Sequence, residues 1–249
     1  MNQETFQIFL WVMSAVALAV FIALYFVKAG YGMFRTASWG ISINNKLAWV
    51  LMEAPVFIVM FGLWGKSGAG FTVPVYFFFL LFQLHYLQRA FIFPFRMPVA
   101  IMAMGIVFNL LNGMMQAGGL FYFAPEGLYA DGWAYLLKPH ALLGVILFFA
   151  GMFINLHSDY VIRHLRKPGD TKHYLPGKGL YRYVTSANYF GEIIEWAGWA
   201  ILTWSLSGLV FLWWTVASLV PRANAIWHRY KEEFGDAVGN RKRVFPFLY

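Results

Sequence analysis

The sequence predicts an all-α membrane protein with seven transmembrane helices, and three observations support this fold class. Of the 249 residues, 60% are hydrophobic and only 12% are charged, whereas soluble domains usually carry about 25% charged residues. Apolar stretches of about 20 residues, long enough to cross a bilayer, recur along the chain. Basic residues alternate with these stretches in a pattern that favours one orientation in the membrane.

The predicted spans are joined by polar links of different lengths. The first is interpreted as a helix rather than a signal peptide, because it is long and no basic residue precedes it. Glu53 and Pro55 lie inside the second, and a glycine-rich link leads to the third. The approximate bounds of the seven spans are 6–27, 47–64, 71–93, 99–116, 134–157, 188–206 and 207–220.

The basic residues predict the orientation. With seven spans, all of the 19 Lys and Arg residues except Lys66 and Lys138 fall on one side of the membrane. Since basic residues concentrate in cytoplasmic loops, the N-terminus is predicted outside and the C-terminus in the cytoplasm. The length leaves no room for a separate soluble domain, so residues 1–249 are predicted to form a single integral-membrane domain.

Composition excludes several kinds of chemistry. The chain has no cysteine, which excludes disulfides, thiolate nucleophiles and iron–sulfur clusters. No two histidines are spaced i, i+3 or i, i+4, so no metal site is predicted, although a haem held by His85 and His140 stays open. The net charge of +8 is spread between spans and indicates topology rather than nucleic-acid binding. No glycine-rich dinucleotide motif follows a strand, so any dinucleotide would be bound without a Rossmann fold.

The most informative polar stretch begins at Asn155, where a long apolar segment leads into a basic loop. Asn155, Asp159 and Arg163 are spaced by four residues and Arg166 follows three later, so in a helix all four share one side. An amide, a carboxylate and two guanidinium groups suit a sugar-phosphate ligand. The alternative interpretation is a basic collar that only fixes the topology.

Further polar residues occur within the predicted spans, where a charged side chain costs about 2.5–3.5 kcal/mol on insertion scales. One interpretation is that they only join helices by hydrogen bonds or ion pairs. As a set they predict one shared hydrophilic cavity. The residues are Glu53, His85, Tyr86, Arg89, Asn188, Glu192 and Glu195.

Tyr86 is the predicted proton donor of this set. A phenol can donate a hydrogen bond to a carbonyl oxygen and stabilise the enolate that forms there. Glu53 could hold that phenol or the same oxygen, and it too can donate if desolvation keeps it protonated.

These residues lie in motifs that closely resemble the steroid 5α-reductases. Glu53 before Pro55 resembles the glutamate in the second span of that family. The resemblance extends over Leu84–Arg89, then over Ile154–Asp170 (INLHSDYVIRHLRKPGD), Tyr174–Tyr181 (YLPGKGLY), Tyr183–Trp196 (YVTSANYFGEIIEW) and the final Pro246–Tyr249 (PFLY).

The resemblance implies a membrane enzyme that reduces the Δ4 double bond of a 3-oxo-steroid with NADPH. Glu53 and Tyr86 would act on the 3-oxo group, with substrate-side residues in 1–98 and most of the cofactor pocket in 99–249. The implied cofactor-binding residues are Arg89, Arg96, Asn155, Asp159, Arg163, Arg166, His173, Asn188, Glu192, Glu195, Arg222, His228 and Tyr230.

The same resemblance implies a monomer that meets a steroid and membrane lipid but no nucleic acid, in a bacterial inner membrane or the endoplasmic reticulum. Membrane enoyl-CoA reductases and isoprenylcysteine methyltransferases share parts of the pattern and remain alternatives. A lipid or ion transporter, or a receptor, is the non-enzyme alternative. The absence of internal repeats in the sequence argues against a transporter.

Overall fold

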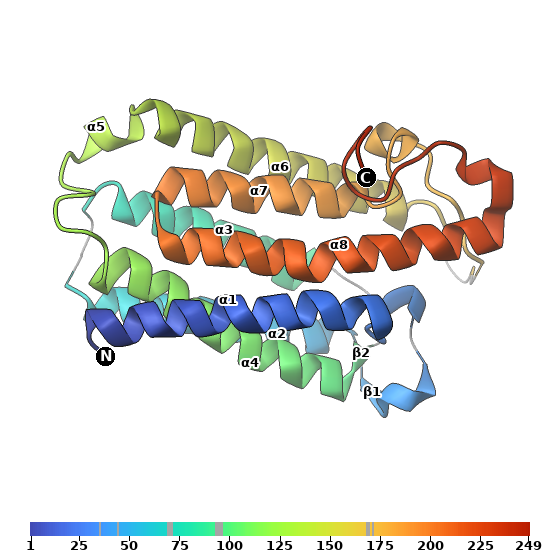
Figure 1. Cartoon of the computed structure of the whole chain (residues 1–249), viewed down its shortest axis with the longest axis horizontal. Coiled ribbons are helices and arrows are strands. Elements are labelled where there is room, and N and C mark those ends of the chain that lie inside the picture. Colours follow the sequence, from blue (N-terminus) through green and yellow to red (C-terminus); the bar gives the residue numbers. More distant parts are fainter. Residues whose placement is uncertain (35, 44, 69–71, 93–96, 168–169, 171) are drawn as a thin grey trace. The chain divides into compact units, whose positions relative to one another are not determined.

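The computed structural model describes residues 1–249 except 35, 44, 69–71, 93–96, 168–169 and 171. The described residues form seven long α-helices (Figure 1), which are α1 Gln3–Phe26, α2 Asn45–Lys66, α3 Val75–Ile92, α4 Val99–Ala117, α6 Pro139–Arg163, α7 Ala187–Thr203 and α8 Leu206–Phe234. The shorter elements are η1 Gly32–Phe34, η2 Ala37–Trp39, β1 Ser42–Ile43, β2 Met97–Pro98, η3 Gly118–Tyr122, α5 Trp133–Leu136, η4 Gly179–Arg182 and η5 Gly235–Val238.

Each predicted span overlaps one of these long helices. Within the described residues, five segments are long and apolar enough to cross a membrane: Gln3–Phe26, Leu47–Lys66, Val99–Tyr122, Pro139–Arg163 and Leu206–Val238. The all-α membrane fold is therefore confirmed, whereas the seven crossings and their orientation stay predictions. Helices α3 and α7 are not among the five, and each carries several of the predicted site residues.

Helix α8 continues well past the predicted end of the last span at residue 220. It includes Pro221 and ends only at Phe234, so the first part of the expected polar tail is helical. At 1.5 Å per residue its 29 residues measure about 43 Å, more than the roughly 30 Å of a hydrocarbon core. Its last turns therefore belong to the polar part of the protein. The hydroxyl of Ser205 accepts the N–H of Gly208 over 3.1 Å and caps the start of the helix.

Helix α6 also differs from its predicted bounds. The expected span 134–157 is divided into the short helix α5 and the long helix α6, which begins at Pro139. It ends at Arg163, so the first turns of the expected basic loop are helical. This extension matters for function, because it places Asp159 on a helix rather than in a loop.

The chain divides into two compact units. Unit 1 comprises Met1–Val12, Ala29–Leu142 and Thr203–Leu209, and unit 2 comprises Met13–Lys28, Leu143–Leu202 and Val210–Tyr249. The predicted single integral-membrane domain is not tested by this division, since α1, α6 and α8 each contribute residues to both units.

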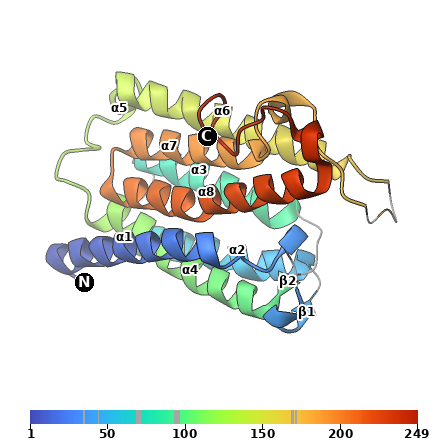
Figure 2. The same cartoon turned by 45° about the vertical axis from the view of Figure 1, so that its right-hand side comes forward.

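Helices α2 and α4 lie side by side in unit 1 (Figures 1 and 2). Gly113 of α4 allows this approach, because an added Cβ would lie 3.0 Å from the Val59 side chain of α2. The strands β1 and β2 precede α2 and α4 and pair in antiparallel register, Ser42 with Pro98 and Ile43 with Met97. This pairing fixes the relative positions of the two helix starts.

Helices α6 and α7 pack along a seam of glycines in unit 2, and they lie side by side in both views (Figures 1 and 2). Added Cβ atoms on Gly144 and Gly151 of α6 would collide with the α7 backbone at Leu202 and Glu195. Those on Gly191 and Gly198 of α7 would collide with the α6 backbone, 2.5 Å from the nitrogen of Asn155 at Gly191. Both pairs are seven residues apart, two helical turns, so the glycines share a face on each helix.

Candidate functional site

A buried polar group in unit 1 contains the two predicted catalytic residues. Glu53 lies on α2 and Tyr86 on α3, and they are only 7% and 5% exposed. Asn109 of α4 donates from Nδ2 to Glu53 Oε2 over 3.1 Å, and Asn112 donates from Nδ2 to the hydroxyl of Tyr86 over 3.0 Å. Because Asn109 and Asn112 are about one turn apart, a single helix contacts both the carboxyl group and the phenol.

Gln116 extends this group by one more turn of α4. Its Nε2 donates to Asn112 Oδ1 over 3.4 Å and to the backbone oxygen of Ser207 over 2.9 Å. A primary amide carries two N–H donors, so both bonds form together. Asn112 and Gln116 are both fully buried. The carbonyl side of the Asn112 amide therefore faces Gln116, and its NH2 side faces Tyr86.

The α2 backbone beside Glu53 also joins the group. Pro55 has no N–H to donate to the backbone oxygen of Leu51, four residues earlier, yet α2 continues through it. Asn109 Nδ2 donates to the backbone oxygen of Met52 over 2.7 Å as well as to Glu53. One α4 amide therefore contacts both the backbone and a side chain of α2 at this point.

Sequence reasoning missed the three amides Asn109, Asn112 and Gln116. A signal was present: within an otherwise apolar helix they are spaced by three and then four residues, which places them on one face. Buried amides require hydrogen-bond partners. Three on one face therefore indicate polar groups on the neighbouring helices.

Two further cofactor candidates come from the third predicted span and the turn after it. Arg89 lies over the ring of Trp49, 5.3 Å from its centroid, in a cation–π geometry within unit 1. Arg96 lies outside the described residues. His85 is 3% exposed, and its ring meets that of the adjacent Tyr86 edge-on at 5.1 Å.

A second polar group lies in unit 2, where α6 faces α7. Asn155 Nδ2 donates to the backbone oxygen of Asn188 over 2.9 Å, and Asn188 Nδ2 donates to Asp159 Oδ1 over 3.2 Å. Asn155 and Asp159 are each 2% exposed. The structure therefore brings together three of the predicted cofactor residues, directly beside the glycine contact at Gly191.

Tyr181 joins this group from the short helix η4, and the sequence analysis did not select it. Its hydroxyl donates to Asn188 Oδ1 over 3.4 Å and it is 1% exposed. Burial holds the pKa of the Tyr181 phenol well above its usual range, and the nearby Asp159 carboxylate raises it further. The phenol therefore stays protonated and acts as a hydrogen-bond donor at neutral pH.

The expected polar face of α6 is only partly realised. Arg163 is the last residue of the helix, so Arg166 lies beyond it and does not share a helical face with Asn155 and Asp159. Arg163 Nε donates to the backbone oxygen of Asp159 over 3.3 Å. Asn155 and Asp159 are buried, whereas both arginines are exposed, because only the buried residues are covered by α7.

The remaining unit 2 candidates divide between buried and exposed positions. Glu195 is 1% exposed, Tyr230 is 8% exposed and Glu192 is half-buried, whereas His228 is exposed. The ring of His228 contacts that of its neighbour Trp227 edge-on at 5.0 Å.

Arg222 and His173 each contact a residue that the sequence analysis did not select. Arg222 of α8 is 8% exposed and donates from Nε to the hydroxyl of Tyr189 over 2.8 Å. His173 Nδ1 lies 3.1 Å from the Glu233 carboxyl oxygens, and Arg229 Nε lies 3.5 Å from one of them. The loop that carries His173 is thereby joined to the C-terminal part of α8.

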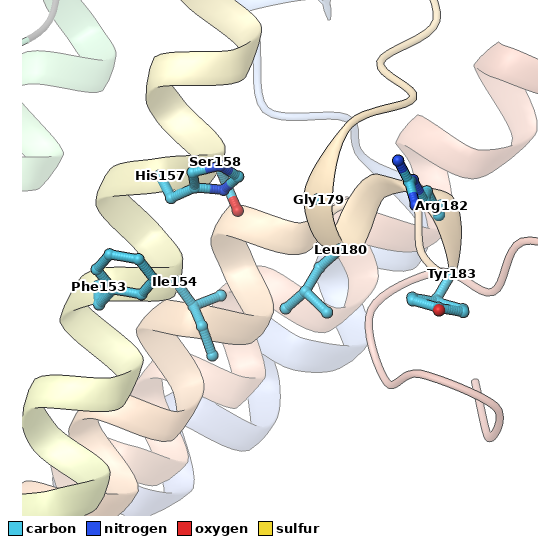
Figure 3. Close-up of a pocket in the computed structure, with 8 residues that line it drawn as sticks. All are labelled: Phe153, Ile154, His157, Ser158, Gly179, Leu180, Arg182 and Tyr183. Atoms are coloured by element: carbon cyan, nitrogen blue, oxygen red, sulfur yellow. The ribbon is translucent and has the colours of Figure 1, made fainter.

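A pocket of about 350 Å³ opens on another part of unit 2, beside η4 (Figure 3). At the edge of this pocket, Gly179, with φ +59°, packs against the imidazole ring of His157. A Cβ added to Gly179 would lie 2.6 Å from that ring. None of the predicted site residues lines this pocket. Its lining residues are Phe153, Ile154, His157, Ser158, Gly179, Leu180, Arg182 and Tyr183.

The donor set of unit 2 fits a dinucleotide. Ribose hydroxyls need amide and carboxylate partners, and phosphates need cations. The hydroxyl of Ser186, at the start of α7, is buried and has no hydrogen-bond partner among the described residues, which leaves a polar atom to meet a ligand. The amide and carboxylate residues are Asn155, Asp159 and Asn188, and the cations are Arg163, Arg166 and Arg222.

A protein family profile matches more than half of the chain. Residues 95–249 match the family profile described as 3-oxo-5-alpha-steroid 4-dehydrogenase. The chain belongs to this family. The matched region contains most of the unit 2 residues described above together with α4.

Relatives of the family from plants and animals align over nearly the whole chain. Steroid 5-alpha-reductase DET2 of Gossypium hirsutum is 37% identical over 260 residues, covering 100% of this chain and 99% of the relative. 3-oxo-5-alpha-steroid 4-dehydrogenase 1 of Homo sapiens is 36% identical, covering 94% and 92%. 3-oxo-5-alpha-steroid 4-dehydrogenase 2 of Sus scrofa is 38% identical, covering 92% and 91%. The match to the Gossypium hirsutum protein covers the whole chain, so it also includes α2 and α3.

Proposed function

We propose that the protein reduces the Δ4 double bond of 3-oxo-steroids to the 5α-reduced ketone, with hydride supplied by NADPH. The observation that carries this proposal is the group of unit 1, in which Glu53 and Tyr86 are buried and hydrogen-bonded to neighbouring amides of α4. Two oxygen-bearing groups held in this way suit a carbonyl oxygen, and family membership supports a steroid ketone as its source.

Tyr86 and Glu53 are the proposed catalytic residues. Hydride adds to the β-carbon of the enone, the electrons of the double bond move onto the 3-oxo oxygen, and a proton from solvent then adds at the α-carbon as the ketone forms again. A hydrogen bond from the Tyr86 phenol stabilises the negative charge on the oxygen while the enolate exists. Glu53, when protonated, donates a second hydrogen bond to that oxygen.

The polar residues of unit 2 are the proposed cofactor site. Asn155, Asp159 and Asn188 would hold ribose hydroxyls, and the arginines would hold phosphates. Tyr181 would keep the Asn188 amide in place for this purpose. When bound, NADPH supplies the hydride.

The apolar helices and the family support an integral membrane protein whose steroid substrate reaches it through the lipid. The protein is also proposed to be a monomer, with its N-terminus outside and its cofactor site on the cytoplasmic side of the membrane. A bacterial inner membrane and the endoplasmic reticulum both fit the span pattern.

The test is a turnover assay on detergent-solubilised protein. NADPH oxidation should depend on an added Δ4-3-oxo-steroid, and mass spectrometry should find a product heavier by two hydrogens. Tyr86→Phe and Glu53→Gln should each lower kcat by about 10²- to 10⁴-fold, the usual range for general acids and bases. The dissociation constant for NADPH should change less than twofold.

Three outcomes would contradict the proposal. Wild-type turnover in both variants would remove the catalytic assignment. Turnover of enoyl thioesters but not steroids, or tight binding of S-adenosylmethionine, would favour the related enzyme classes. Ligand flux across proteoliposomes without NADPH consumption would favour a transporter.

A further inference from the structure

We infer that Asn112 of α4 is a positioning residue for the Tyr86 phenol. This inference rests on the proposed function and concerns the direction of the phenol's proton. Asn112 Nδ2 donates to the Tyr86 oxygen over 3.0 Å. The oxygen accepts this bond through a lone pair, so the single phenol proton must point to a different acceptor. In the proposed reaction that acceptor is the 3-oxo oxygen of the steroid.

The orientation of the Asn112 amide is itself fixed. A side-chain amide could present either its oxygen or its NH2 group to Tyr86, and only the NH2 group leaves the phenol as a donor to substrate. Gln116 Nε2 donates to Asn112 Oδ1 and to the backbone oxygen of Ser207, so the Asn112 oxygen is held on the side away from Tyr86. Gln116 thus determines that Asn112 donates a hydrogen bond to the phenol rather than accepting one from it.

The hydrogen bonds from Gln116 to Asn112 and from Asn112 to Tyr86 are shielded from water. Asn112 and Gln116 have no exposed surface, and Tyr86 is 5% exposed, so water does not readily replace a lost partner. The ring of Tyr86 also packs on Phe82, with ring centroids 4.8 Å apart. Ring packing sets where the phenol lies, and Asn112 sets which way its O–H points.

Asn112 also favours the reaction electronically. A donor to the phenol oxygen draws electron density from the O–H bond, because hydrogen bonds in a chain polarise one another. The phenol is then a stronger donor at the moment when charge accumulates on the substrate oxygen. Asn112 reaches the substrate only through Tyr86, so its effect should vanish when the Tyr86 hydroxyl is absent.

The experiment is a double-mutant cycle in steroid turnover. Asn112→Leu keeps roughly the side-chain volume and removes the donor. In the wild-type background it should lower kcat about 10- to 100-fold, with the NADPH dissociation constant changed less than twofold. In the Tyr86→Phe background the same substitution should lower kcat less than about twofold, because the bond it removes is already absent.

Two further variants separate positioning from folding. Gln83→Leu removes a buried amide of α3, whose Nε2 donates to the backbone oxygen of Phe57, and it should leave kcat within about threefold of wild type. If Asn112→Leu does not fold, Gln116→Leu tests the same chain one bond further away. Gln116→Leu should lower kcat, but by less than Tyr86→Phe does. In the Tyr86→Phe background, Gln116→Leu should not lower kcat further.

The inference is overturned if Asn112→Leu keeps kcat within twofold of wild type, or if it lowers kcat equally with and without the Tyr86 hydroxyl. If the proposed function itself is wrong, the same assays give a different result. The wild-type protein would then show no steroid-dependent NADPH oxidation, or Tyr86→Phe would keep the wild-type rate.

Discussion

Asn188 of α7 donates its side-chain amide to the Asp159 carboxylate of α6 over 3.2 Å, while its own oxygen accepts the hydroxyl of Tyr181. The direction of this bond is fixed, because an ionised carboxylate has no proton to donate and the amide N–H must therefore be the donor. It joins the two helices at the proposed ribose site, so cofactor binding and helix packing depend on the same pair.

Exchanging the two residues tests this dependence. Asn188→Asp places two carboxyl groups about 3 Å apart and removes a donor to a buried acceptor, which should cost about 1–3 kcal/mol of stability. Asp159→Asn alone should cost less. The double variant Asp159→Asn/Asn188→Asp restores one donor and one acceptor, and should recover part of the loss. Thermal unfolding in detergent measures all three, and equal unfolding temperatures for the double variant and Asn188→Asp would contradict the direct bond.

Gly191 provides a second prediction, which concerns the helix contact beneath that pair. A Cβ at Gly191 would lie 2.5 Å from the backbone nitrogen of Asn155, and a backbone atom cannot move aside as a side chain can. Gly191→Ala should therefore destabilise the protein by about 1–3 kcal/mol and raise the NADPH dissociation constant.

The matched control is Gly62→Ala in α2, where an added Cβ meets nothing within 4 Å. In the middle of a helix this change should be neutral or stabilising by up to about 1 kcal/mol. Equal unfolding temperatures for Gly191→Ala and Gly62→Ala would show that α6 and α7 do not pack as closely as described.

The helices were predictable from sequence where their apolar runs end in basic or glycine-rich links, as at the end of α2. Their ends were not predictable where the helix continues into polar sequence. Helix α8 passes Pro221 and Arg222 because buried contacts, such as the Arg222–Tyr189 bond, support residues that a hydropathy argument assigns to a tail. Propensity and hydropathy are local, whereas these contacts are tertiary.

The candidate site was predictable to the same extent. Glu53, Tyr86 and Asn155 were recognisable as polar residues in apolar sequence, and the structure gives them buried positions. Their partners Asn112 and Tyr181 were not recognised, since an amide or a phenol in an aromatic-rich chain resembles ordinary packing until the facing helix is known. The i, i+3, i+7 spacing of amides in α4 was the one local signal available.

Arg222 leads to a third prediction. Its Nε donates to the Tyr189 hydroxyl over 2.8 Å, which orients the guanidinium group. Arg222→Gln removes the charge and should raise the NADPH dissociation constant about tenfold or more if the group holds a phosphate. Tyr189→Phe keeps the charge and removes only the orienting bond, so it should have a smaller effect. Titration of cofactor fluorescence measures both, and a larger effect of Tyr189→Phe would contradict a phosphate contact.

Asp170 provides a prediction about pH, in the loop that follows Arg166. Its Oδ1 accepts the backbone N–H of Lys172 over 2.9 Å and its Oδ2 accepts the hydroxyl of Tyr174 over 2.7 Å. These two bonds, the backbone bond first, hold the pKa of the Asp170 carboxyl below its ordinary value, and the charge of Arg166 adds to them. A carboxyl whose folded pKa is depressed stabilises the fold above its ordinary pKa, and this contribution is lost as the pH falls through the lowered value.

The loop should therefore keep both bonds from neutral pH down to about pH 4, the ordinary range of an aspartate, and lose them below it. Hydrogen exchange of peptides covering residues 172–176, corrected for the intrinsic rate at each pH, should show protection that falls only in that acidic range. Asp170→Asn should remove the pH dependence, since an amide does not titrate there. Tyr174→Phe should keep the dependence but shift its midpoint upward, because the Tyr174 bond helps to lower the Asp170 pKa. Identical profiles for the wild type and Asp170→Asn would mean that the carboxylate does not hold this loop.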